Sequence, residues 1–489
     1  MRRLFVLFLA LLFVPLAISG SSDATETDSD GTTYEYVTHG SGHPDYYCEI
    51  AGVKTSSEVL HLPSVLEGYD VHTILSGALD GCGSTVVIVP GNLEEIQSGA
   101  FAGCSATDVY LMGDTVVGGG ALDGFRVHAV RTDGQWSSAE RIEVVSQGGV
   151  DYALLPDGAT AIGGVPVDGR LEIAGYVDGF AVTSVGDYAF AGEMQADGTV
   201  ERRSDIGKVV LPEGLVSIGQ RAFYYNDLSE VSVPGSLEYV RDEAFRACTH
   251  LGGFLFTENL AYIGFEAFRD CHSLTAVDIP GSVERLCDGA FYICQGITTL
   301  RVDTDLPARA FGYCTSLVDV TLGDGVEGIG SGAFYRCELL RSVEIPGGVS
   351  EIGAESFRDC VSLSHVDLGQ TESIGRAAFR GCLSLTEIDI PETVSSMGGY
   401  SFADCMKLRD VYAYGKAPGG GDTVFLNDTA TVHCRPADLD SWSSSAFGLE
   451  VVGDIGSGTS LFLYLGLILV AVAGAFVALY IVRNRKDRT

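Results

Sequence analysis

Cysteine is the residue of this chain whose type and spacing could do chemistry. Ten of the 13 cysteines stand three residues after a Phe or Leu, as in IGFEAFRDCHSLTAVDIP, where Cys271 follows Phe268. A series of thiols can form disulfides, bind a metal or act as redox groups. The ten positions are Cys82, Cys104, Cys248, Cys271, Cys294, Cys314, Cys337, Cys360, Cys382 and Cys405.

Two observations favour a column of buried free thiols. Asn226 holds the cysteine position in one unit, and a disulfide partner could not be replaced singly without leaving its mate unpaired. Equivalent side chains on stacked coils also point the same way, whereas a disulfide needs converging Cβ vectors. Stacked strands lie about 4.8 Å apart, which leaves disulfides open as the alternative, with Cys287 and Cys294 as the pair to examine. Zinc is disfavoured, because no C-x-x-C pair or histidine cluster is present.

No other motif of the sequence predicts catalysis. We find no G-x-S-x-G, H-E-x-x-H or P-loop, and the nine histidines do not recur with the cysteines. We therefore expect no enzyme activity, no catalytic or metal-binding residue and no cofactor. Asn427 opens an Asn-Asp-Thr glycosylation sequon.

The Phe before each cysteine anchors a repeat of 20 to 23 residues. The unit reads V-x-x-I-G-x-x-A-F-x-x-C-x-S-L-x-x-V-x-I-P. Its V-x-I-P segment alternates apolar and polar residues, which predicts a short strand with one buried face, ended by the proline. We expect the Ile-Gly pair to bury one side chain and then let the backbone bend. Units of this length cannot bury their own apolar face, so they stack into a continuous core.

This unit resembles the BspA-like leucine-rich repeat family of surface proteins. The resemblance covers most of residues 34–452 and includes a closing segment at the C-terminal end. It implies a β-rich leucine-rich repeat solenoid. It also implies adhesion to host or extracellular-matrix proteins and to other cells.

The array is interrupted once, which predicts two arrays, each preceded by a small β unit. Residues 34–135 hold the first β unit and a short array, and residues 136–410 hold the second β unit and a long array. Residues 411–455 form the closing segment. The stretch 192–208 lengthens one unit and is expected to protrude as a charged loop.

Both ends of the chain predict export and membrane anchoring. Residues 1–19 read as a secretory signal peptide, with an uncleaved anchor as the alternative, and residues 20–33 as a polar linker. Residues 460–482 carry no charge and are long enough to span about 30 Å of hydrocarbon. The basic tail 483–489 marks the cytoplasmic side. We expect a single-pass cell-surface protein with an extracellular N-terminal region.

The formal net charge of −35 disfavours binding to nucleic acid and favours cations or basic partners. Acidic residues recur at the positions of the V-x-I-P strands that should face outward. Stacked like charges repel, so cations or a basic ligand could compensate them; alternatively, this is simply the surface of an acidic protein. The predicted binding face comprises Asp278, Arg301, Asp319, Glu344, Asp367, Glu387, Asp389, Asp410 and Tyr412.

Two functions fit these features. The first is protein–protein, cell–cell or host adhesion through the extended solenoid face, with an extracellular protein or another cell surface as partner, bound directly or through cations. The alternative is a structural cell-envelope component that packs with itself. The mixed side chains of the face favour binding, since lattice packing favours a uniform surface.

Overall fold

The computed structural model describes residues 24–27, 32–39, 47–63, 65–66, 69–91, 93–113, 115–130, 139–194, 200–443 and 447–455. The predicted signal peptide (1–19), membrane span (460–482) and tail (483–489) lie outside these residues. Within the part of the chain that is described, no helix is long and apolar enough to cross a membrane.

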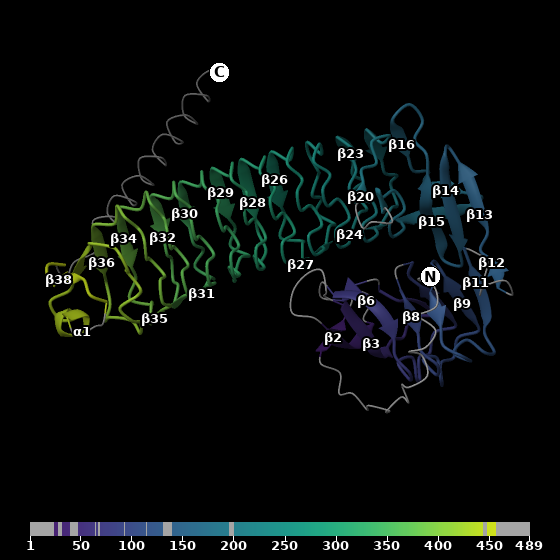
Figure 1. Ribbon diagram of the computed structural model, residues 1–489, viewed down its shortest axis with the longest axis horizontal. Helices are drawn as coiled ribbons and strands as arrows, with labels where there is room; N and C mark the ends of the chain where they lie inside the picture. Colours follow the sequence, from purple (N-terminus) through teal and green to yellow (C-terminus); the bar gives the residue numbers. More distant parts are fainter. Residues whose placement is uncertain are drawn as a thin grey trace, which may run out of the picture.

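The chain folds into a leucine-rich repeat β-solenoid made almost entirely of short strands. Each regular coil of the repeat contributes its V-x-I-P segment to one row of parallel strands, and many coils also contribute their Ile-Gly segment to a second row. Figure 1 shows the long array running from β16 to β38, with the short array beside its N-terminal end. His61 of the short array bonds to Asp157 of the long array at 2.8 Å.

Two sheets form the short array. The first contains β1 (Ala24–Thr27), β2 (Thr33–His39), β3 (Tyr47–Lys54), β5 (Val65–Leu66), β6 (Tyr69–Ile74), β8 (Glu95–Ile96) and β10 (Val116–Val117). The second contains β4 (Val59–His61), β7 (Val86–Val89), β9 (Asp108–Leu111), β11 (Arg126–Ala129) and β12 (Glu140–Arg141).

The long array begins with antiparallel strands and continues as parallel coils. Its Ile-Gly row contains β13 (Val144–Gln147), β14 (Val150–Leu155), β15 (Gly158–Gly164), β17 (Tyr176–Val177), β18 (Phe180–Val185), β22 (Ser217–Ile218), β24 (Tyr239–Val240), β25 (Tyr262–Ile263) and β27 (Arg285–Leu286), followed by the separate sheet β31 (Glu351–Ile352), β33 (Ser373–Ile374) and β35 (Ser396–Met397).

The V-x-I-P row of the long array, which we call the outer row, falls into four sheets. They are β16 (Arg170–Glu172), β21 (Lys208–Val210) and β23 (Glu230–Ser232); β26 (Ala276–Ile279), β28 (Thr299–Val302) and β29 (Asp319–Leu322); β30 (Ser342–Glu344) and β32 (His365–Asp367); and β34 (Glu387–Ile390), β36 (Asp410–Ala413), β37 (Thr431–Cys434) and β38 (Glu450–Val452). The short helix α1 (Leu439–Ser443) precedes β38.

Two segments differ from the sequence prediction, and a third contains strands. Residues 24–27, assigned to the polar linker, form β1 and pair antiparallel with β2. The first array extends past residue 135, because β12 pairs with β11. The lengthened unit at 192–208 contains a short antiparallel pair, β19 (Glu193–Met194) with β20 (Val200–Glu201).

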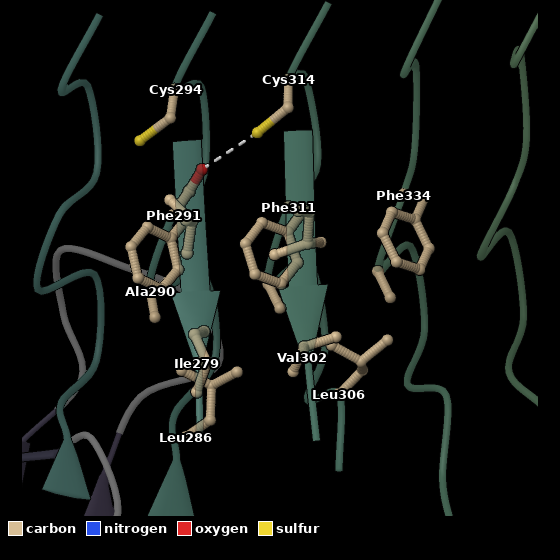
Figure 2. Close-up of a cluster of buried hydrophobic side chains, with 14 of the residues drawn as sticks. Ile279, Leu286, Ala290, Phe291, Cys294, Val302, Leu306, Phe311, Cys314 and Phe334 are labelled. Atoms are coloured by element: carbon tan, nitrogen blue, oxygen red, sulfur yellow. Dashed lines mark hydrogen bonds between the residues drawn. The ribbon is translucent and has the colours of Figure 1, made fainter. Parts of the chain in front are cut away.

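Among the described residues, the apolar side chains gather in two hydrophobic cores, one per array. A single stack of phenylalanine rings runs through the long array, with neighbouring centroids 5.1–6.0 Å apart and ring planes within 15° of parallel. Figure 2 shows part of it, Phe291, Phe311 and Phe334. Phe425 extends the stack into the predicted closing segment. That segment therefore contains one more coil of the repeat.

The glycine of the Ile-Gly pair has a different role from the expected bend. A Cβ on Gly264 would lie 2.5 Å from the backbone nitrogen of Asp242, and one on Gly353 would lie 2.5 Å from the carbonyl oxygen of Ile329. Both atoms belong to the preceding coil. Glycine is needed there because neighbouring backbones pass too close for any side chain.

Candidate binding surface

The cysteine column is structural. Each column thiol from Cys248 to Cys405, which excludes Cys287, donates a hydrogen bond to the carbonyl of the Phe in the preceding coil, at 3.0–3.4 Å. The bond from Cys314 to Phe291 is drawn in Figure 2. Asn226 makes the equivalent bond with its amide, to Phe190 at 2.6 Å. The interchange of Cys and Asn therefore preserves a donor for a buried carbonyl.

All 13 cysteines lie in the described residues as free thiols, as the sequence analysis favoured. Burial raises the pKa of Cys248 to about 12 and the pKa of Cys271 well above its usual value. Thiols held neutral in this way are poor nucleophiles and poor metal ligands. Cys82 differs, because a hydrogen bond with Cys104 lowers its pKa to about 6. Cys287 and Cys294, the pair named as a possible disulfide, are free thiols as well.

The predicted face residues lie on the outer row with the expected alternation. In β26, Ala276 and Asp278 are exposed while Val277 and Ile279 are buried. Arg301, Asp319, Glu344 and Asp367 are likewise exposed, and Glu387, Asp389, Asp410 and Tyr412 are half-buried.

The breaks between sheets divide these residues into three groups. Asp278 stands opposite Arg301 in the β26–β28 register, and Asp319 lies on the next strand. Glu344 stands opposite Asp367. The third group is the set of pairs Glu387–Asp410 and Asp389–Tyr412 on β34 and β36. Sequence periodicity could not show these breaks, because the repeat continues through them.

Asp389 is half-buried and has acidic neighbours. Burial raises its pKa to about 6, and the neighbouring charges of Glu387 and Asp367 add to the effect. At the C-terminal end of the face, His433 bonds to Asp410 at 3.0 Å and to Asp454 at 2.8 Å, and its ring stacks on Tyr412. Burial alone would lower the pKa of His433, but these hydrogen bonds outweigh it and raise the pKa. Sequence analysis missed His433, since the histidines do not recur with the repeat.

The first break in the outer row opens a hollow of about 650 Å³ beside β26. Here residues 254–257, Phe-Leu-Phe-Thr, replace V-x-I-P and form no strand, so the outer row has a gap between β23 and β26. The rings of Phe254 and Phe256 pack edge-on against the ring of Phe268, with their centroids 4.9 and 5.5 Å from its centroid. These bulky rings fill the space that Val and Ile occupy in other coils. The missing proline and the paired Phe were the available sequence signals.

A second surface, formed by the turns around the Phe anchors, was also missed. Arginines there lie over tyrosine rings of nearby coils, as Arg336 does over Tyr313 at 5.5 Å and Arg358 over Tyr335 at 5.6 Å. Nearer the N-terminal end, Arg246 bridges two buried carboxylates, Glu243 and Glu266, at 2.7 and 2.8 Å. We call these turns the Tyr–Arg edge. Its side chains pair with one another, which leaves less capacity for a partner.

In the described ranges, no three His, Cys, Asp or Glu side chains are placed to hold an ion.

One known protein family matches more than half of the chain. The BspA type leucine rich repeat region matches the chain in 6 copies, at residues 59–117, 181–298 and 304–430, which together exceed half of its length. The chain belongs to this family. The BspA-type match ends at residue 430, beyond the predicted start of the closing segment, in agreement with the position of Phe425 in the ring stack.

Several solved bacterial structures are similar to this BspA-type chain. A leucine rich repeat protein of T. pallidum is 29% identical, covering 40% of this chain and 91% of that chain, with a TM-score of 0.36. A leucine-rich repeat protein from Bacteroides ovatus is 20% identical, covering 63% of this chain and 99% of that chain, with a TM-score of 0.32. A leucine rich cell surface protein from Faecalibacterium prausnitzii is 21% identical, covering 65% of this chain and 99% of that chain, with a TM-score of 0.33. No curated protein matches the chain.

Proposed function

We propose that this BspA-type solenoid is a single-pass cell-surface protein that binds an extracellular protein or another cell surface through its outer row. The observation that carries the proposal is the side-chain alternation of the outer row. It presents exposed residues of mixed chemistry, such as Asp278, Arg301 and Asp367, on strands held rigid by a buried ring stack. Rigid surfaces bind with little loss of conformational entropy.

The cell-surface part of the proposal rests on the sequence. The apolar segments 1–19 and 460–482 and the basic tail 483–489 favour export and anchoring. The acidic outer row favours a basic partner surface, because complementary charge speeds encounter and suppresses unlike partners.

Capture of purified extracellular-matrix proteins by the full-length chain tests this function. The variant D367N/E387Q/D389N removes three charges from the outer row and should weaken capture several-fold at low salt. The matched variant E327Q/E351Q/E372Q removes three exposed charges from the coils of the Ile-Gly row and should bind like the wild type. Equal weakening by both variants would show that net charge alone attracts the partner.

Self-packing is the competing outcome. If the immobilised chain captures only soluble copies of itself and no matrix protein, the envelope-component alternative replaces adhesion. Calcium is added and withdrawn in parallel, since cation bridging predicts capture that requires calcium.

A further inference from the structure

We propose that the hollow beside β26 binds an extended basic peptide segment of the partner, which adds as a strand to the free edge of β26. This inference rests on the proposed function and names the partner chemistry of one place on the outer row. It follows from three features of the hollow: its course, its unpaired backbone groups and its charges.

The hollow follows the backbone of β26. Six consecutive residues, 276–281, line it, including Val277 and Ile279, whose side chains point into the core. Residues whose side chains point outward and residues whose side chains point inward both line the hollow, so the hollow runs along the edge of the strand rather than over one of its faces. Residues 254–256 line it as well, together with residues 299–301 of β28. A volume of about 650 Å³ lies within the range of protein ligand sites.

The edge of β26 that faces the hollow has unpaired backbone groups. In the next coil, the N–H groups of Thr299 and Asp303 point back to the carbonyls of Thr275 and Ile279. Ala276 and Asp278 occupy the positions in β26 that Thr299 and Arg301 occupy in β28. Because alternate residues of a parallel strand bond to opposite neighbours, the N–H and C=O groups of Ala276 and Asp278 point at the preceding coil, toward residues 253–256. Throughout the described residues 200–443, no backbone partner takes these groups.

Such a row of donors and acceptors is what an added strand requires. In β-strand addition, main-chain hydrogen bonds supply the affinity, and the side chains select the sequence. The bulk of Phe254 and Phe256 explains why the protein's own chain does not pair here.

The charges around the hollow select a basic segment. Among the described residues, the side chains of Glu258, Asp278, Asp319 and Arg301 make no hydrogen bond or ion pair. Three of these four unpaired groups are acidic, and Asp303 adds a further carboxylate. Leu255, 64% exposed, supplies an apolar contact on the rim. An extended peptide that alternates basic and apolar residues complements this lining.

Two similar breaks in the outer row provide an internal comparison. Neither β29 with β30 nor β32 with β34 is paired in the described sheets, yet none of the residues of β30, β32 or β34 lines this hollow. Ser342 on β30 occupies the position equivalent to Ala276 and is exposed. Proline at position 276 or 342 removes a backbone N–H that donates to no backbone carbonyl of the described residues. We therefore expect A276P and S342P both to fold.

Fluorescence anisotropy with a labelled peptide, Val-Lys-Val-Lys-Val-Lys-Val, tests the inference on the purified full-length chain. We expect saturable binding with a stoichiometry of one. The A276P variant should bind at least about tenfold more weakly, because it loses an edge donor and places a ring in the path of the strand. S342P should bind within about twofold of the wild type.

Two further peptides separate strand addition from charge attraction. N-methylation of alternate amides leaves the charges but removes the donors of one edge, and should abolish binding whether or not A276P folds. Replacement of Lys by Glu should also abolish it. Failure of the Lys peptide to bind the wild type overturns the inference, as does binding that survives both N-methylation and A276P. Continued capture of a matrix protein in that case would leave the proposed function standing.

Discussion

From Phe223 to Phe402, the position three residues after the Phe anchor holds a side chain that donates to the anchor carbonyl of the preceding coil. Cysteine does this along most of the long array, and Asn226 does it with a shorter bond to Phe190. The column therefore stabilises the stack by satisfying buried carbonyls, and the chemistry of the thiol is not used.

Removal of the donor at Asn226 tests this role. N226A should destabilise the chain by about 1–3 kcal/mol, because the Phe190 carbonyl is left buried without its donor. N226C keeps a donor of the type found in the other coils and should stay within about 1 kcal/mol of the wild type. Urea denaturation of the two variants measures the difference. Equal loss in both would mean that shape, rather than the hydrogen bond, matters at this position.

Asp428 occupies the same column position in the last coil, three residues after Phe425. Burial raises its pKa to about 7, and the nearby charge of Asp404 adds to the effect. The folded state therefore holds a proton that the unfolded chain releases at lower pH. Stability should fall as the pH rises from about 4 through about 7, and then level off, since both states are ionised above that range.

The variant D428N cannot ionise and retains a donor. It should raise the melting temperature more at pH 8 than at pH 5, as measured by circular dichroism. A gain that is the same at both pH values, or larger at pH 5, would contradict the protonation of Asp428 in the folded chain.

At the scale of elements, the close approach of neighbouring coils sets the residue types of the Ile-Gly row. G264A should destabilise the chain by about 1–3 kcal/mol, since its Cβ would lie 2.5 Å from the Asp242 nitrogen. G347A is the control, because no atom lies within 4 Å of the added Cβ. It should be neutral or slightly stabilising. Chemical denaturation compares the two, and equal effects would refute the close-approach argument.

The regular elements could be predicted because the residue types within each repeat indicate which positions form the strand, the turn and the core. The alternation of Val277, Asp278 and Ile279 predicted their burial correctly. The breaks in the outer row could not be predicted in this way. The break before β26 arises where rings of different coils meet, as Phe254 meets Phe268, and such contacts between coils have no fixed spacing in the sequence.

The candidate face was predicted in part for the same reason. Outward positions follow from the period of two, so Arg301 and Asp367 lie where the pattern places them. The hollow and the His433 contacts depend on how separate coils approach one another. The pairing of His433 with Asp410 and Asp454 joins three coils, which a pattern within one coil does not contain.

At the scale of the whole molecule, the two hydrophobic cores should unfold as separate cooperative units. L79A removes a fully buried side chain from the short array and should lower the stability of that array by about 2–5 kcal/mol. N226A should act on the long array alone. Hydrogen exchange resolved by peptide measures each array, and a parallel loss of protection in both arrays from either variant would show that they unfold together.

The central claim is that the outer row of the long array is the binding surface. Hydrogen exchange on the full-length chain, with and without a captured matrix protein, tests it most directly. We expect slowed exchange along the outer row, in residues 253–258 and in β26, β28, β29, β32 and β34, with the turns of the Tyr–Arg edge unchanged. Slowed exchange confined to the Tyr–Arg edge, or to the short array, would contradict it.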